Sequence, residues 1–197
     1  MQNVIEIFNK HYGYAYLKDL KAQGVHTDTI RKLLVEGKIE KIKPGLYRVS
    51  DFPVMAHQGF VDVCMAIPRA VICLHSALSY YGLTTAVPPV VMGALPREAK
   101  APRLQYPPVK VFYFSRANYE MGMELVHTET GDFRIYGVEK TIVDCFRYRN
   151  RLGEDVAVEG LKNCLARKDA DLNRLFLYAR KGRMYHVIKP YVEALMA

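Results

Sequence analysis

The sequence contains no apolar run that approaches the roughly 18–20 residues needed to cross a membrane. Its first residues, MQNVIEIFNKHYG, carry Glu6 and Lys10 inside the apolar pattern, so we expect no cleaved export signal. No two cysteines show C-x-x-C spacing and no histidine cluster accompanies them, which argues against a zinc site. We therefore expect a cytoplasmic protein without a membrane partner, with reduced and buried thiols at Cys64, Cys73, Cys145 and Cys164.

Signatures of catalysis are also missing. There is no P-loop, no G-x-G-x-x-G, and no G-x-S-x-G turn around Ser76, so the expected role of His75 or Ser76 is a hydrogen bond, either local to the helix or between domains. A metal-dependent nuclease would need carboxylates on one face, but Glu139 and Lys140 are adjacent, and neighbours in a strand face opposite sides. The sequence thus predicts no enzyme, no metal and no cofactor, and a nuclease using Asp132 and Glu139 is the weaker alternative.

Positive charge is concentrated at the two ends of the chain. The formal charge is +8 over 197 residues. Residues 1–50 hold nine Lys/Arg and five Asp/Glu, residues 51–140 hold eight of each, and residues 141–197 hold eleven and seven. Each end therefore carries an excess of four positive charges, which favours polyanionic partners at both ends.

The first 50 residues show the element order of a winged helix-turn-helix. Apolar spacing predicts a helix over residues 2–11, a strand or tether at 14–16, and a short helix from 17 that stops near 24. Thr27 is expected to cap a third helix, which ends at Gly37. KIEKIKPGLYRVS then predicts a hairpin that turns at Pro44-Gly45, with a half-buried second strand.

Residues 50–59, SDFPVMAHQG, resemble a connector, after which a second domain over residues 58–197 is expected. It should begin with two mainly helical stretches that end at Gly82. Strands over 88–95 and 109–115 and a hairpin around 130–132 should follow, and then four helical segments from residue 138, the last kinked at Pro190. The predicted fold is α+β: an N-terminal winged helix-turn-helix over 1–50, then a mixed α/β domain ending in helices.

The helix predicted after Thr27 offers basic side chains opposite its apolar stripe. Such a helix fits the DNA major groove, and Arg side chains can pair with guanine edges while Lys neutralises phosphates. Basic residues of the hairpin would reach the neighbouring backbone. The candidate DNA-binding residues are Thr29, Arg31, Lys32, Lys41, Lys43 and Arg48.

The same residues also fit a protein-interaction adaptor in which the winged helix does not bind DNA, because Arg-Lys pairs on helices and Lys on edge strands are common solvated surface. The clusters RYRNR at 147–151 and YARKGR at 178–183 are equally typical of a solvated face and of a surface for an acidic partner.

Three stretches resemble the AbiEi-type antitoxins of abortive-infection systems, which are bacterial transcriptional regulators classed with type IV toxin–antitoxin pairs. They are GYAYLKDLKAQGVHTDTIRKLLVEGKIEKIKPGLYRV, LHSALSYYGLT and YGVEKTIVDCFRYRNRLG, and the likeness runs from about residue 3 to residue 190. The resemblance implies a winged-helix repressor of its own operon that binds double-stranded DNA at inverted repeats, as a monomer or weak dimer.

It further implies that the second domain counters a nucleotidyltransferase-like toxin in function, without a stable complex. Basic residues near the C-terminus serve antitoxicity in that family, so the corresponding candidates for an antitoxicity or partner surface are Arg147, Arg149 and Arg151.

Overall fold

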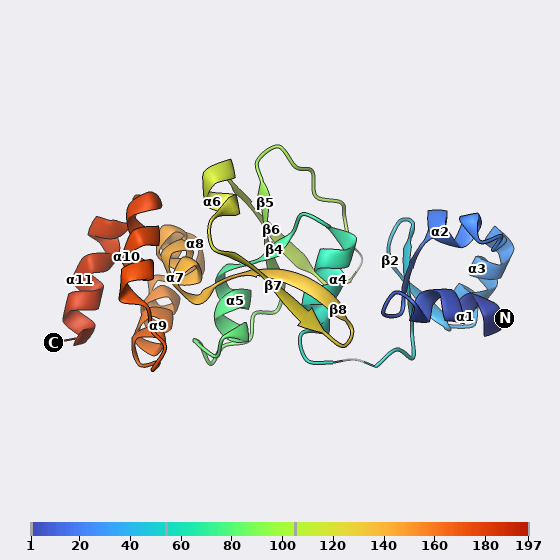
Figure 1. Ribbon diagram of the computed structural model, residues 1–197, viewed down its shortest axis with the longest axis horizontal. Helices are drawn as coiled ribbons and strands as arrows, with labels where there is room; N and C mark the ends of the chain where they lie inside the picture. Colours follow the sequence, from blue (N-terminus) through green and yellow to red (C-terminus); the bar gives the residue numbers. More distant parts are fainter. Residues whose placement is uncertain (1, 54, 105, 197) are drawn as a thin grey trace.

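A computed structural model describes residues 2–53, 55–104 and 106–196. We call residues 2–50 the N-terminal module and residues 58–196 the C-terminal module. The molecule is elongated, with the N-terminal module at one end, a mixed sheet in the middle and a group of helices at the other end (Figure 1). The two chain ends lie at opposite ends of the long axis. This arrangement is α+β, as expected.

The N-terminal module contains three helices and three strands. They run in the order α1 (Gln2–Asn9), β1 (Tyr14–Tyr16), α2 (Leu17–Ala22), α3 (Thr27–Val35), β2 (Ile39–Lys43) and β3 (Leu46–Val49). The strands form an antiparallel sheet in the order β1-β3-β2, with a register shift between Lys41 and Lys43. This order fits a winged helix, with residues 14–16 forming a strand.

The central strand β3 is covered on both faces, which corrects the expectation of a half-buried strand. Tyr47 packs with Phe8, Leu20 and other side chains of the three helices, whereas Leu46 belongs to a second core that includes Phe60 of the C-terminal module. The sheet therefore lies between the N-terminal helices and the rest of the protein.

The C-terminal module is built on a five-stranded mixed sheet in the order β6-β5-β4-β8-β7. Its strands are β4 (Val71–Ile72), β5 (Val91–Pro96), β6 (Val109–Phe114), β7 (Met123–Thr128) and β8 (Gly131–Tyr136). The pairs β5–β6 and β4–β8 are parallel, and β4–β5 and β7–β8 are antiparallel. The hairpin expected around residues 130–132 is thus present, as β7–β8.

Helices cover both faces of this sheet. One face packs on α4 (Gln58–Ala66), which separates the sheet from the N-terminal module (Figure 1). The other face packs on α5 (Leu74–Tyr80) and on the helices that follow the sheet, with α6 (Arg116–Glu120) at the rim. Those later helices are α7 (Val138–Arg147), α8 (Arg149–Leu152), α9 (Glu154–Leu165), α10 (Leu172–Lys181) and α11 (Tyr185–Met196).

Alternation along the strands separates the two cores. In β4, Val71 points to the side of α7, and its neighbour Ile72 points to the side of α4. The sequence predicts a helix over residues 70–73, but Val71 and Ile72 form a strand and are fully buried at the middle of the sheet. α11 is continuous through Pro190. No helix among the described residues is long and apolar enough to cross a bilayer.

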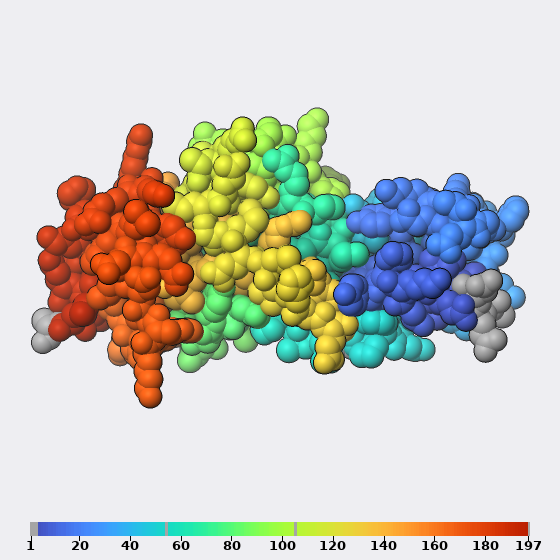
Figure 2. Space-filling view, in the orientation of Figure 1, coloured from blue at the N-terminus to red at the C-terminus, as the bar shows by residue number. Residues whose placement is uncertain are grey.

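The two modules share one continuous apolar core. Tyr14, Ile42 and Leu46 of the N-terminal sheet pack with Phe60 and Val63 of α4 and, through them, with the five-stranded sheet. Figure 2 shows the N-terminal module in close contact with the middle of the molecule on the face in view. Helix α4 lies between the two sheets, and each sheet covers one of its sides. Its polar residues Gln58 and Asp62 are therefore buried as well.

Candidate nucleic-acid interface

Helix α3 presents a polar face at the end of the molecule furthest from the C-terminal helices (Figure 1). Ile30 and Leu33 are buried against the other N-terminal helices, which turns Arg31 and Lys32 toward solvent. Thr29 is half-buried. The helix begins at Thr27, so the N-cap is His26 rather than the expected Thr27, and no side chain caps it.

Both exposed cations of α3 have a weak local partner. Arg31 Nη1 lies 3.5 Å from Asp28 Oδ1, with side chains 76% and 84% exposed, and Lys32 Nζ lies 3.9 Å from Glu36 Oε1. Exposed pairs of this kind contribute about 0–1 kcal/mol, so their cations can exchange a carboxylate for a phosphate at little cost. The face remains available to an anionic partner.

The wing is the hairpin formed by β2 and β3, and its basic residues lie on both faces of the N-terminal sheet. Lys41 is exposed and is paired in register with Tyr47, whose ring packs on the N-terminal helices. Since paired residues share a face of the sheet, Lys41 lies on the same side as α3. Glu40 and Arg48 are likewise paired with each other, and they face the C-terminal module.

Arg48 is buried between the modules, which differs from the DNA contact expected of it. Its Nη1 donates to Asp62 Oδ1 and Oδ2 at 2.7 and 2.8 Å, and its Nε donates to Glu40 Oε1 at 2.8 Å. Burial opposes its charge, but Asp62, Glu40 and Tyr14 together outweigh this and raise the pKa of Arg48 above its ordinary value. The guanidinium of Arg48 thus contacts Glu40 of its own module on one edge and Asp62 of the C-terminal module on the other, and it links the two modules.

Lys43 also faces the C-terminal module. Its Nζ donates to the backbone carbonyl of Ala66 at 2.6 Å, at the end of α4. Burial lowers the pKa of Lys43. The structure therefore differs from the prediction of a DNA contact at Lys43. The ammonium group instead donates to a backbone carbonyl that has no partner within α4, at the C-terminal end of that helix.

A polar cluster around Asp62, which was not predicted from the sequence, accompanies these contacts. Asp62 Oδ1 accepts the hydroxyl of Tyr14 at 2.5 Å, and Gln58 Nε2 donates to that hydroxyl at 2.8 Å. Burial raises the pKa of Asp62, partly offset by Tyr14 and Arg48. A carboxylate within the apolar stretch GFVDVCMA was the available signal, because a buried carboxylate requires a partner.

The three arginines proposed for a partner surface lie in different environments. Arg147 is half-buried at the end of α7 and donates through Nη2 to the carbonyl of Gly182. Arg149 Nη1 donates to the carbonyl of Phe146 at 2.9 Å. Arg151 is exposed. Arg147 and Arg151 both line one shallow cavity of about 440 Å³ beside Tyr113.

The residues considered for catalysis have separate partners. Asp132 Oδ1 lies 3.0 Å from His127 Nδ1 on the exposed β7–β8 hairpin. Glu139 Oε2 lies 2.9 Å from Arg174 Nε. Lys140 forms a buried pair with Asp144. Ser76 Oγ accepts the backbone N–H of Met92 at 2.9 Å, so its hydrogen bond joins α5 to β5 within the C-terminal module. This bond is neither local to the helix nor between the domains, which differs from the prediction for the His75-Ser76 pair. Within the described ranges, no group of three His, Cys, Asp or Glu side chains is placed to hold a metal.

All four cysteines are free and buried, as expected. Burial raises the pKa of Cys64 and of Cys164 to about 11, and places those of Cys73 and Cys145 well above the ordinary range. These thiols are therefore protonated and unreactive at neutral pH.

Residues 2–50 match the model of a family described as "Transcriptional regulator, AbiEi antitoxin". The matched segment coincides with the N-terminal module and confirms the expected resemblance there. The C-terminal module lies outside the match. No curated protein matches the chain.

Proposed function

From the premise that residues 2–50 are those of an AbiEi-type transcriptional regulator, we propose that this protein represses transcription by binding operator DNA through α3 and the wing. The observation that carries the proposal is the exposed cationic face of α3, at the end of the molecule that the C-terminal module leaves uncovered. The proposed DNA contacts are Thr29, Arg31, Lys32 and Lys41.

The division of roles within the hairpin supports this assignment. Lys41 faces the side of α3, whereas Lys43 and Arg48 hold α4 on the other face of the sheet. A major groove about 12 Å wide admits a single helix, and a neighbouring wing then lies along the phosphate backbone. In this arrangement Arg31 is the candidate for base readout, while Lys32 and Lys41 neutralise phosphates.

We further propose that the operator is an inverted repeat upstream of the protein's own gene, occupied by two copies as monomers or a weak dimer. Occlusion of the promoter requires no ligand, metal or catalytic step. The proposed second role is that of an antitoxin that counters a nucleotidyltransferase-like toxin in function, without a stable complex. Arg151, which is exposed on α8, is the leading candidate residue for that role.

The regulator proposal is tested by fluorescence anisotropy with the DNA upstream of the gene and with a shuffled duplex, at several salt concentrations. The test variant is Arg31→Ala with Lys32→Ala. The matched control is Arg180→Ala with Lys189→Ala, which removes the same charges from exposed positions on the terminal helices. We expect upstream-specific binding that weakens with salt, is lost in the test variant, and is retained in the control.

Equal and feeble binding to both duplexes would reject the regulator and favour the protein-interaction adaptor. The antitoxin role is tested separately, by co-expressing the protein with the product of the neighbouring gene and measuring growth. Rescue by the Arg31→Ala, Lys32→Ala variant would show that antitoxicity does not require DNA binding.

A further inference from the structure

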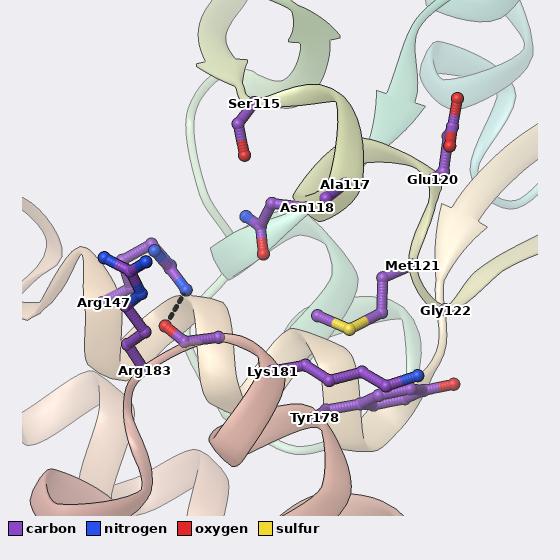
Figure 3. Close-up of a pocket in the computed structure, with 11 residues that line it drawn as sticks. Ser115, Ala117, Asn118, Glu120, Met121, Gly122, Arg147, Tyr178, Lys181 and Arg183 are labelled. Carbon is purple, nitrogen blue, oxygen red and sulfur yellow. Dashed lines mark hydrogen bonds between the residues drawn. The ribbon is translucent and has the colours of Figure 1, made fainter.

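A cavity of about 820 Å³ lies in the C-terminal module between α6, the ends of α7 and α10, and the turn that follows α10 (Figure 3). Arg147, Lys181 and Arg183 bring three cationic groups to its wall, with Tyr178 and Met121 among the other lining residues. Its size is within the range of about 300–1,000 Å³ typical of sites for small molecules.

The positive charge of this cavity is not cancelled by its acidic residue. Glu120 also lines the wall, but its Oε1 lies 2.9 Å from Arg116 Nε, so this carboxylate already has a cation. In Figure 3 the carboxylate of Glu120 points away from the arginines. Across the described residues, Lys181 and Arg183 have no ion-pair partner.

The buried pair directly behind the wall leaves the positive charge of Arg147 uncancelled. Lys140 and Asp144 form a pair with both side chains fully buried, and Arg147 Nε lies 3.9 Å from Asp144 Oδ1. The three groups carry a total charge of +1 whether the proton of the pair resides on the lysine or on the carboxylate. Low polarity around these groups leaves that charge poorly screened.

Local geometry fixes Arg147 in place. Its Nη2 donates to the carbonyl of Gly182, and a Cβ at Gly182 would lie 2.8 Å from this same nitrogen, so a larger residue would displace the guanidinium. The Nε of Arg147 is buried and, among the described residues, donates no hydrogen bond. A guanidinium held in place in this way is preorganised to pair with a phosphate.

The remainder of the wall suits a flat, partly apolar group. Tyr178 is half-buried, and with Met121 it provides an aromatic and a thioether surface, while Ser115 and Asn118 provide polar groups on the opposite side (Figure 3). Inorganic phosphate would use the cations but would leave most of an 820 Å³ cavity unfilled. A nucleoside phosphate has both the charge and the flat ring that this wall can contact.

We propose that this cavity binds a nucleoside 5′-phosphate, with the phosphate near Arg147 and Arg183 and the base beside Tyr178 and Met121, where the side chain of Lys181 also lies (Figure 3). The phosphate can belong to a free mononucleotide or to the 5′ end of a nucleic-acid strand. The site is separate from α3, and the inference does not rest on the proposed operator binding.

The test is isothermal titration calorimetry of the full-length protein with AMP, UMP, the parent nucleosides, inorganic phosphate, and a dinucleotide with and without a 5′-phosphate. The variant is Lys181→Gln with Arg183→Gln, which leaves the structurally engaged Arg147 intact. Its control is Lys162→Gln with Lys189→Gln, which removes two exposed charges elsewhere on the same module. We expect nucleotide binding that is weakened about tenfold or more in the variant and unchanged in the control.

Tighter binding of the mononucleotide would identify a free nucleotide as the ligand, and tighter binding of the phosphorylated dinucleotide would identify a strand end; either result supports the shared chemistry. Equal affinity for inorganic phosphate and AMP, equal loss in variant and control, or no binding of any probe would overturn the proposal. The Arg31→Ala, Lys32→Ala variant should bind the nucleotide normally, which separates this result from the fate of the operator proposal.

Discussion

Arg48 and Asp62 form an ion pair across the two modules, in which Nη1 lies 2.7 and 2.8 Å from the two carboxylate oxygens. Their side chains are 10% and 1% exposed. One partner lies on the central strand of the N-terminal sheet and the other on α4, so this buried contact ties the placement of α3 to the C-terminal module. A residue whose type suggests DNA binding is used here to orient the proposed DNA-binding surface.

Replacing Asp62 by alanine should destabilise the protein strongly. Loss of the carboxylate leaves the guanidinium of Arg48 buried with only Glu40, and breaking a buried pair in this way costs about 3–5 kcal/mol. Urea unfolding at pH 7 measures the effect, and the free energy of unfolding should fall by that amount.

The matched control for this change is Glu98→Ala. Glu98 pairs with Arg69 at 2.9 Å, but both side chains are more than half exposed, so the loss should be about 0–1 kcal/mol. In the cycle of Asp62→Ala and Arg48→Ala, the double variant should lose less than the sum of the single variants, because neither partner is then left alone. Additive losses would show that the two residues act independently.

Lys41→Gln and Lys43→Gln should differ in their effects on operator affinity. Both changes remove one charge from β2, but Lys41 is exposed on the side of α3, whereas Lys43 donates to the carbonyl of Ala66. If Lys41 neutralises one phosphate, its loss should reduce the slope of log affinity against log salt by about 0.9. Lys43→Gln should leave that slope unchanged, and an equal reduction in both would place the wing differently on DNA.

The arrangement of the N-terminal module could be predicted because its signals are local. Apolar spacing around Ile30 and Leu33 defines the buried face of α3, and Pro44-Gly45 marks the turn of the hairpin. Alternation also places Arg48 on the opposite face of β3 from Tyr47, but it does not reveal what covers that face. The partner there is residue 62, and such a contact between distant segments leaves no periodic signal.

The short strand β4 could not be predicted for a related reason. Val71 and Ile72 continue an apolar run into α5, and such a run fits a helix as well as a buried strand. Only the pairing of Ile72 with Gly93 and Ile135 on either side makes it the central strand. The cavity beside Arg147 likewise joins residues 115–122 to residues 178–183, which are far apart in the chain.

Stability should fall as the pH rises above about 9, because of the buried thiols. Burial raises the pKa of Cys64 to about 11, while a thiol in the unfolded chain titrates near its ordinary value of about 8.5. Between these values the folded state keeps a proton that the unfolded state releases, so raising the pH favours unfolding, by about 1.4 kcal/mol per pH unit for each such thiol.

Urea unfolding at pH 8, 9 and 10 checks this expectation. Cys64→Ala should lower the steepness of the decline by about one proton, since the variant has one fewer group whose pKa differs between the two states. Equal steepness in the variant and the unmodified protein would mean that Cys64 does not contribute.

Variants of the buried pair Lys140–Asp144 test whether this pair contributes to stability and to ligand binding in the adjacent cavity. Asp144→Ala should destabilise the protein by about 3–5 kcal/mol, because it leaves a fully buried lysine whose ammonium lies 4.5 Å from the ring centre of Tyr136 and 5.0 Å from that of Phe114. Lys140→Met with Asp144→Leu removes both charges and replaces them with apolar groups, so most of that stability should return.

The double variant should also bind AMP as well as the unmodified protein does. It removes one positive and one negative charge, and the sum over Lys140, Asp144 and Arg147 stays at +1, so the potential at the cavity wall changes little. Calorimetric titration with AMP, beside urea unfolding of the same sample, measures both quantities. If the double variant is stable but its affinity for AMP falls about tenfold, the phosphate must depend on the pair itself, and the net charge behind the wall is not what attracts it.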